Sequence, residues 1–215
     1  MDMRKFAAVL MALVMMFALT ACGAQPAESA GEVSVQANGF VHGRWDNGVY
    51  SNEFLNMTFT PGQNFSMLPD SDLAPMVMQI SPKQLASANV FDFVDRVVEV
   101  VALGSNQSDE LWINVEQGAC TDERIEARMQ GTLDRLNRRY GSACMDGGRF
   151  EVELGGQTFT AQKFDARNGS GDVNKSEYVL MRSAGEHTCI VALSTTENGI
   201  SLDEVAGMFG TVETI

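Results

Sequence analysis

Two successive hairpins in the C-terminal half of the chain constrain its fold most. Arg149–Leu154 and Gln157–Asp165 are strand-like segments separated by a Gly-Gly dipeptide, a two-residue turn that tolerates positive φ. Glu177–Ser183 and His187–Ser194 repeat the pattern across a three-residue turn that contains a glycine. Strands joined by such short turns lie side by side and run in opposite directions. This half of the chain therefore predicts an antiparallel sheet.

Four further segments upstream have the composition of strands. They are bounded by polar turn residues, and they are Val49–Ser51, Asn56–Thr60, Val97–Leu103 and Glu110–Glu116. In the last of them, alternation puts one set of side chains on one face, namely Leu111, Ile113 and Val115. The set on the other face is Trp112, Asn114 and Glu116.

The clearest helix is predicted at Thr121–Tyr140. Its apolar residues recur at three- and four-residue spacing and form one stripe, namely Ile125, Met129, Leu133, Leu136 and Tyr140. Arg138 and Arg139 in the last turn complement the helix dipole, and Gly141 follows as a C-terminal cap. Shorter helices are predicted to begin after Ser81 and at the capping box that opens with Ser201.

Together these elements predict an α+β fold, in which a central, mainly antiparallel β-sheet is covered by helices. The predicted globular domain is single and occupies residues 40–215.

The N-terminus is typical of an export signal. Two basic residues precede an uncharged apolar run, Phe6–Leu19, which is too short to cross a hydrocarbon core of roughly 30 Å comfortably. The next residues, Leu-Thr-Ala-Cys, resemble the lipobox of bacterial lipoproteins, in which the cysteine thiol is joined to diacylglycerol. The resemblance implies that residues 1–21 are removed by cleavage between Ala21 and Cys22 and that Cys22 carries the lipid. The alternative is an ordinary signal peptide that happens to contain a cysteine.

Residues 22–39 are predicted to be the lipidated cysteine and a flexible tether. Gly23–Asn38 is mostly Gly, Ala, Ser, Gln and Glu without an aromatic residue, so it cannot bury enough apolar surface to offset its chain entropy. Two acyl chains anchor a protein stably. The predicted location is therefore the extracytoplasmic face of a bacterial cell membrane, with the membrane as a partner through Cys22.

The charge of the chain excludes one class of partner. The formal net charge is −13, and removal of residues 1–21 leaves 13 basic and 27 acidic residues, a charge of −14. Binding to phosphate backbones needs clustered Lys and Arg, so nucleic acid is not an expected partner. Solubility of an exported protein accounts for the acidity.

A longer resemblance begins with the sequence GRWDNGVYSNEFLNMTFTPGQNF, residues 43–65. This segment is similar to the start of a group of lipoproteins from gut Clostridia and their relatives. Those proteins open with a Tyr-x-Asn-Glu strand, a strand of alternating apolar residues and then Pro-Gly-Trp. The matching residues are Tyr50, Asn52, Glu53, Leu55, Phe59, Pro61 and Gly62. Gln63 stands at the tryptophan position, and Phe65 is expected to take over its packing. The resemblance implies a PsbP-like α/β/α sandwich and a binding or accessory role.

Three cysteines follow Cys22. Cys120 and Cys144 bracket the long helix, which spans about 30 Å. A disulfide needs Cα atoms about 4.4–6.8 Å apart, so these two are not expected to pair. Cys189 either pairs with one of them or all three are reduced, and buried free thiols are the prediction.

His187 and Cys189 form the sharpest enzymatic candidate, because residues two apart on a strand share a face. Their Cβ atoms would lie roughly 6–7 Å apart, which is long for direct proton transfer. Strand packing is the alternative role of both residues.

No cofactor and no metal site is predicted. The segment DVNKSEY, which begins at Asp172, resembles the start of a calcium loop, but Glu177 stands where such loops need glycine. A solvated hairpin loop is predicted there instead. The two histidines of the chain are too few for a histidine-based zinc site.

Two classes of function remain. The first is a non-catalytic, lipid-anchored module that binds an unknown protein or small-molecule ligand at the cell surface. The second is an extracytoplasmic enzyme whose site is assembled from distant residues. A pocket with convergent titratable groups of shifted pKa would favour the enzyme, and a cleft without them would favour the binding module.

Overall fold

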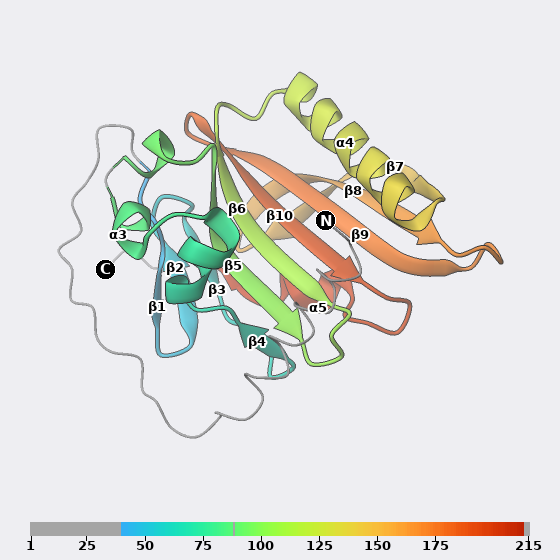
Figure 1. Ribbon diagram of the computed structural model, residues 1–215, viewed down its shortest axis with the longest axis horizontal. Helices are drawn as coiled ribbons and strands as arrows, with labels where there is room; N and C mark the ends of the chain where they lie inside the picture. Colours follow the sequence, from blue (N-terminus) through green and yellow to red (C-terminus); the bar gives the residue numbers. More distant parts are fainter. Residues whose placement is uncertain (1–39, 88, 213–215) are drawn as a thin grey trace. The chain divides into compact units, whose positions relative to one another are not determined.

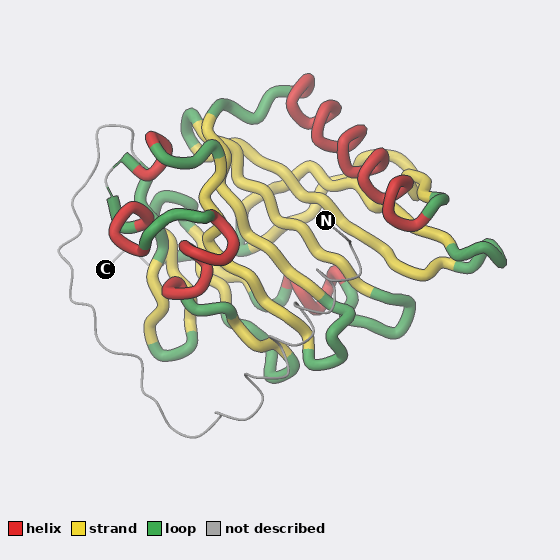
Figure 2. Tube along the Cα trace, in the orientation of Figure 1, coloured by secondary structure: helices red, strands yellow, loops and turns green. Residues whose placement is uncertain are grey.

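The computed structural model describes residues 40–87 and 89–212. The predicted signal peptide, Cys22 and the tether therefore lie outside the described residues. Within the described ranges the strands form one sheet of seven and one of four, and every pair of neighbouring strands is antiparallel (Figures 1 and 2). The predicted α+β class with a mainly antiparallel sheet is confirmed.

The seven-stranded sheet contains both predicted hairpins. Its strands, in spatial order, are β4 (Phe65–Met67), β5 (Arg96–Gly104), β6 (Glu110–Gln117), β10 (His187–Thr195), β9 (Val173–Ala184), β8 (Gln157–Arg167) and β7 (Ala143–Leu154). One prediction was wrong here. The segment expected to be a solvated loop is strand from Val173 onward, and only Asp172 belongs to the turn before it.

The four-stranded sheet brings the two ends of the described chain together. Its strands, in order, are β1 (Arg44–Asp46), β2 (Val49–Asn52), β3 (Met57–Phe59) and β11 (Phe209–Gly210). β11 follows α5 (Leu202–Ala206), which begins at the predicted capping box. The sequence did not predict this second sheet, because the pairing of β11 with β3 joins residues about 150 positions apart.

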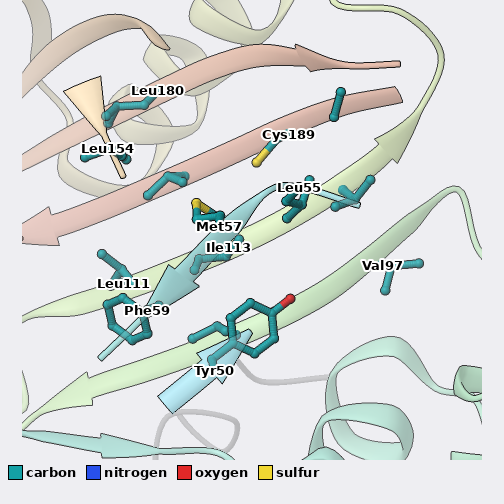
Figure 3. Packing of buried hydrophobic residues seen from close by; sticks show 14 of the residues in the cluster. Tyr50, Leu55, Met57, Phe59, Val97, Leu111, Ile113, Leu154, Leu180 and Cys189 are labelled. Carbon is teal, nitrogen blue, oxygen red and sulfur yellow. The ribbon is translucent and has the colours of Figure 1, made fainter. Parts of the chain in front are cut away.

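The core lies between the two sheets. Tyr50, Met57 and Phe59 of the small sheet pack against β5, β6 and β10, as Figure 3 shows. Leu111 and Ile113 of β6 face them and are fully buried. Each large apolar side chain buried in this way stabilises the fold by roughly 1.5–3 kcal/mol. We call the side of the large sheet that faces this core the inner face.

Two separate groups of helices cover the opposite, outer face. α4 (Asp122–Tyr140) packs Ile125, Met129 and Leu136 onto β8, β9 and β10. α2 (Asp70–Asp72) leads into the π-helix η1 (Leu73–Met78), which packs onto β5 through Leu73. α3 (Pro82–Leu85) and the 3₁₀-helix η2 (Val90–Asp92) complete the connection to β5.

A buried carboxylate holds the first strands against the large sheet. A β-bulge in β5 lies at Glu99, which is fully buried and is turned toward the small sheet. Its carboxylate accepts hydrogen bonds from the backbone N–H of Gly43 (2.8 Å), Asn52 Nδ2 (3.0 Å) and the Tyr50 hydroxyl. His42 Nδ1 lies 2.9 Å from the same carboxylate. Two of the residues that carry the family resemblance, Tyr50 and Asn52, thus have a structural role.

Candidate binding groove

A cavity of about 310 Å³ lies beside α4 on the outer face, above β6, β10 and β9. Strand register fixes its floor. Trp112 lies opposite Ala192, which lies opposite Val179 on the next strand. Asn114, two residues further along β6, lies opposite Ile190. These side chains share one face because successive residues of a strand point to opposite sides. We call this cavity the outer groove.

One edge of α4 forms the wall of the outer groove. Arg128, Thr132, Arg135 and Arg139 line the cavity, and Arg124 extends the same edge toward the start of the helix. The spacings of three and four residues put these side chains on one side of the helix, next to its buried apolar stripe. In a chain of net charge −13, this edge concentrates positive charge at one place.

Ion pairs join the arginine edge to the floor. Glu116 of β6 receives hydrogen bonds from Arg124 (3.2 Å) and Arg128. Glu177 of β9 receives one from Arg135. The fold therefore fixes the height of the helix edge above the sheet at two points.

Two arginines of the groove have no such partner. Arg96, at the start of β5, and Arg139 form no ion pair within residues 40–87 and 89–212, although Arg139 lies over the ring of Tyr140 at 5.3 Å from its centroid. Their guanidinium groups are available to a ligand.

Asn114 is the least satisfied polar side chain of the floor. It is only 6% exposed, and its Oδ1 is buried without a hydrogen-bond partner among the described residues. Leaving a buried acceptor unpaired costs about 1–3 kcal/mol. Buried polar side chains ordinarily have a partner, as Thr188 on the neighbouring strand does, because its hydroxyl donates a 2.8 Å hydrogen bond to the Gly118 carbonyl. Folded proteins contain few acceptors like the Asn114 oxygen, and each needs an explanation.

A carboxylate of the groove has a shifted pKa. Burial raises the pKa of Glu177, the nearby Glu110 adds to that rise, and Arg135 opposes it. A titratable group of shifted pKa in a pocket favours the enzyme among the two classes of function. However, Glu177 and Glu116 are both bound by arginines, so they serve to join the floor to the helix edge.

A second cavity, of about 590 Å³, adjoins the outer groove. Arg96 and Glu116 line both cavities. The second one adds the apolar side chains of Val77, Met78 and Val94, together with Asp95. Arg96 and Glu116 therefore form a charged junction between the two cavities, with apolar surface on either side. We call the second one the side cavity.

The structure separates the candidate pair His187 and Cys189 from any accessible site. Both lie on the inner face of β10, as predicted, but no hydrogen bond joins them in the described part of the chain. The His187 ring packs among the rings of Phe40, Phe54 and Phe91. Burial lowers the pKa of His187 and raises the pKa of the fully buried Cys189 thiol to about 12. A nucleophilic thiol needs the opposite shift.

The three described cysteines are free, and their exposure differs. Cys189 is buried, as predicted for all three, but Cys120 is half-buried and Cys144 is exposed on β7. The expectation of buried thiols is therefore confirmed for Cys189, only partly met by Cys120 and wrong for Cys144, because β7 is an edge strand with no neighbour on one side.

Residues 40–87 and 89–212 contain no group of three or more His, Cys, Asp or Glu side chains placed to hold a metal ion. The same residues include no helix that is long and apolar enough to span a membrane.

The outer groove was not predicted from the sequence. Arg138 and Arg139 were assigned to the helix dipole, and the arginines along the rest of the helix were not assigned a role. Their recurrence at positions 124, 128, 135 and 139, beside the apolar stripe, was the available signal. The alternation in β6 had already put Trp112, Asn114 and Glu116 on one face, which is now the floor.

No protein-family model matches the chain, and no curated protein matches it either. Solved structures do match. The solution structure of cyanobacterial PsbP (CyanoP) from Synechocystis sp. PCC 6803 is similar over 87% of this chain and 99% of that one, with 13% identity and a TM-score of 0.48. A crystal structure from Bacteroides thetaiotaomicron VPI-5482 is similar over 77% of this chain and 48% of its own, with 8% identity and a TM-score of 0.38. Neither likeness says anything about function.

Proposed function

We propose that this protein is a lipid-anchored, extracytoplasmic bacterial lipoprotein whose globular part binds a ligand in the outer groove without transforming it. One observation carries the binding role. The Asn114 oxygen is buried at the floor of a cavity and has no partner among the described residues. A ligand that donates a hydrogen bond to it would remove the cost of leaving it unpaired.

The geometry of the groove supports binding rather than catalysis. Polar groups converge on a concave surface from a helix edge and four strands, with Trp112 as a flat apolar element. Small-molecule sites combine such surfaces with a few placed polar groups. The residues that position the wall are held by ion pairs and by packing on the sheet, so the site is formed before a ligand arrives.

The anchoring part of the proposal rests on the sequence. A basic start, a short apolar run, small residues and Cys22 occur in the order that lipidation requires. Metabolic labelling with a fatty acid tests it, with Cys22→Ser as the comparison. Label is expected on the wild type and absent from the variant, and equal labelling would refute the anchor.

A groove-filling variant tests the binding part. Trp112 fluorescence, measured in a Trp45→Phe background, is titrated with mixed-sequence hexapeptides, neutral disaccharides and simple carboxylates. Ala192→Phe fills the floor without changing charge, whereas Thr158→Phe adds the same ring at an exposed position of β8.

We expect at least one probe to give a saturable change in the Trp45→Phe protein and with Thr158→Phe added, and none with Ala192→Phe. No response to any probe, or an undiminished response with Ala192→Phe, would exclude the outer groove as the binding site.

A second function is favoured by one observation, the raised pKa of Glu177 near Glu110. A pair of carboxylates can serve as acid and base in hydrolysis. Under this alternative, turnover of a chromogenic glycoside or ester would be lost in both Glu177→Gln and Glu110→Gln. The ion pair of Glu177 with Arg135 makes it the weaker candidate.

A further inference from the structure

We infer that the ligand of the outer groove is the free C-terminal end of an extended peptide, with its carboxylate bound at the junction of the two cavities. This inference rests on the proposed binding role of the groove and names the chemistry of the ligand.

The junction has an excess of positive charge. Three arginines, Arg96, Arg124 and Arg128, meet there against two carboxylates, Glu116 and Asp95. Glu116 is shared by Arg124 and Arg128, and Arg96 has no ion-pair partner among the described residues. At the other end of the groove, Arg135 and Arg139 are balanced by Glu177 and Glu110. An anionic group therefore fits the junction and not the far end.

The side chains of the floor recur along β6 at the same spacing as alternate residues of an extended peptide. Glu116, Asn114 and Trp112 follow one another on the outer face of β6, so each step along the floor is two strand residues, or roughly 6.6 Å. An extended peptide that lies along this floor presents alternate residues at the same intervals. With its carboxylate at the junction, it has backbone amides near Asn114 and a side chain near Trp112.

Asn114 favours a peptide over other carboxylates. Its Oδ1 accepts an N–H and its amide nitrogen donates to a carbonyl, so one side chain can pair with both groups of a peptide backbone. The side cavity contributes the apolar surface of Val77, Met78 and Val94, which suits an apolar side chain. An anionic sugar has hydroxyl donors but no such side chain.

The test compares two forms of one peptide. The probe is an N-acetylated pentapeptide of phenylalanine followed by four alanines, made with a free carboxyl end and with an amidated end. Binding to the full chain is measured by Trp112 fluorescence in the Trp45→Phe background. 3-Phenylpropionate and a galacturonate trimer serve as a small and a sugar carboxylate. Arg96→Gln removes the unpaired guanidinium, and Arg138→Gln is the matched control, an exposed arginine of α4 outside both cavities.

The free acid is expected to bind at least tenfold more tightly than the amide. Arg96→Gln should weaken the acid about tenfold and leave the amide unchanged, and Arg138→Gln should change neither. Arg96 is exposed, so the variant is expected to fold, and an unchanged unfolding midpoint would show that it does.

Equal affinity of acid and amide, or no binding of either, would overturn the inference. So would tighter binding of 3-phenylpropionate or of the galacturonate trimer, since the ligand would then be another carboxylate. Where any probe binds, Ala192→Phe separates failure of this inference from failure of the proposed function. If it abolishes whatever binding is seen, the groove remains the site, and if it does not, the binding role fails as well.

Discussion

At the scale of single residues, one buried carboxylate explains the structural roles of Gly43, Tyr50 and Asn52. Glu99 stands alone in a valine-rich strand, and a buried carboxylate needs hydrogen-bond donors to be tolerated. The fold supplies them from Gly43, Tyr50 and Asn52. The sequence contained the signal for this cluster, a lone acidic residue in an apolar strand, but the donors come from residues about 50 positions away and were not predictable from it.

Gly43 is required by its contact with Tyr50. A Cβ added at position 43 would overlap the fully buried Tyr50 ring, which cannot move because its hydroxyl binds Glu99. Gly43→Ala should therefore lower the free energy of unfolding by about 1–3 kcal/mol. Urea denaturation measures it, and an unchanged midpoint would contradict this packing.

His42 makes stability depend on pH in the alkaline range. Burial disfavours the imidazolium, but the carboxylates of Glu99 and Asp70 outweigh this and raise the pKa of His42 to about 10. A folded-state pKa above the ordinary value of about 6.5 gives a contribution that is complete below pH 6.5 and is lost as pH rises through about 10. Urea denaturation at pH 7 and 10.5 should show a larger loss in the wild type than in His42→Gln.

The same cluster acts in the opposite direction in acid. Burial alone would raise the pKa of Glu99, but His42, Tyr50 and Gly43 together lower it. Its contribution is therefore present above the ordinary carboxyl pKa and is lost as pH falls through the lowered value. The alkaline comparison also tests the charges of this cluster. If wild type and His42→Gln lose stability equally between pH 7 and 10.5, His42 and Glu99 do not form a charged pair in the folded protein.

The three described thiols should react in an order set by burial. Cys144 is exposed, whereas burial raises the pKa of Cys120 and raises that of Cys189 to about 12. A thiol reagent at pH 8 should modify Cys144 in the folded protein and Cys189 only after unfolding. Mass mapping of the modified peptides checks this order, and early labelling of Cys189 would contradict its burial.

At the scale of elements, α4 was predictable because its signals are local. Its apolar stripe, the Thr121 cap and the left-handed Gly141 all lie within the helix or next to it. The two hairpins were predictable for the same reason. The π-helix η1 was not, because it depends on packing against β5, which comes more than 15 residues later in the chain. The start of β9 was also missed although its partner is local, because its polar residues have the composition of a loop and only their pairing with the end of β8 makes them a strand.

Gly131 is a correctable weakness of α4. It lies in the middle of the helix, and a Cβ there would meet nothing within 4 Å. Gly131→Ala should therefore raise the free energy of unfolding by about 0.5–1 kcal/mol, because alanine loses less backbone freedom in a helix. Thermal and urea unfolding check it, and a loss of stability would mean that the helix surface is more crowded than described.

At the scale of the whole molecule, the groove results from incomplete coverage of one sheet face. α4 covers β8 to β10 and η1 covers β5, so the outer face of β6 remains between them. The sequence predicted the helix, the strand and the face to which Asn114 belongs. It could not predict the pairing of Arg135 with Glu177, which are 42 residues apart, and so it could not assemble the site.

The free energy of unfolding of Asn114→Val, measured in urea without ligand, tests the central claim most directly. Thr188→Val is the control, because it removes a buried hydroxyl of the neighbouring strand β10 that does have a partner, the Gly118 carbonyl. If Asn114 is kept for a ligand, Asn114→Val should be more stable than the wild type by about 1–3 kcal/mol, and Thr188→Val less stable by about 1 kcal/mol. A loss of stability in Asn114→Val comparable to that of the control would contradict the claim, since the amide would then already be satisfied within the folded chain.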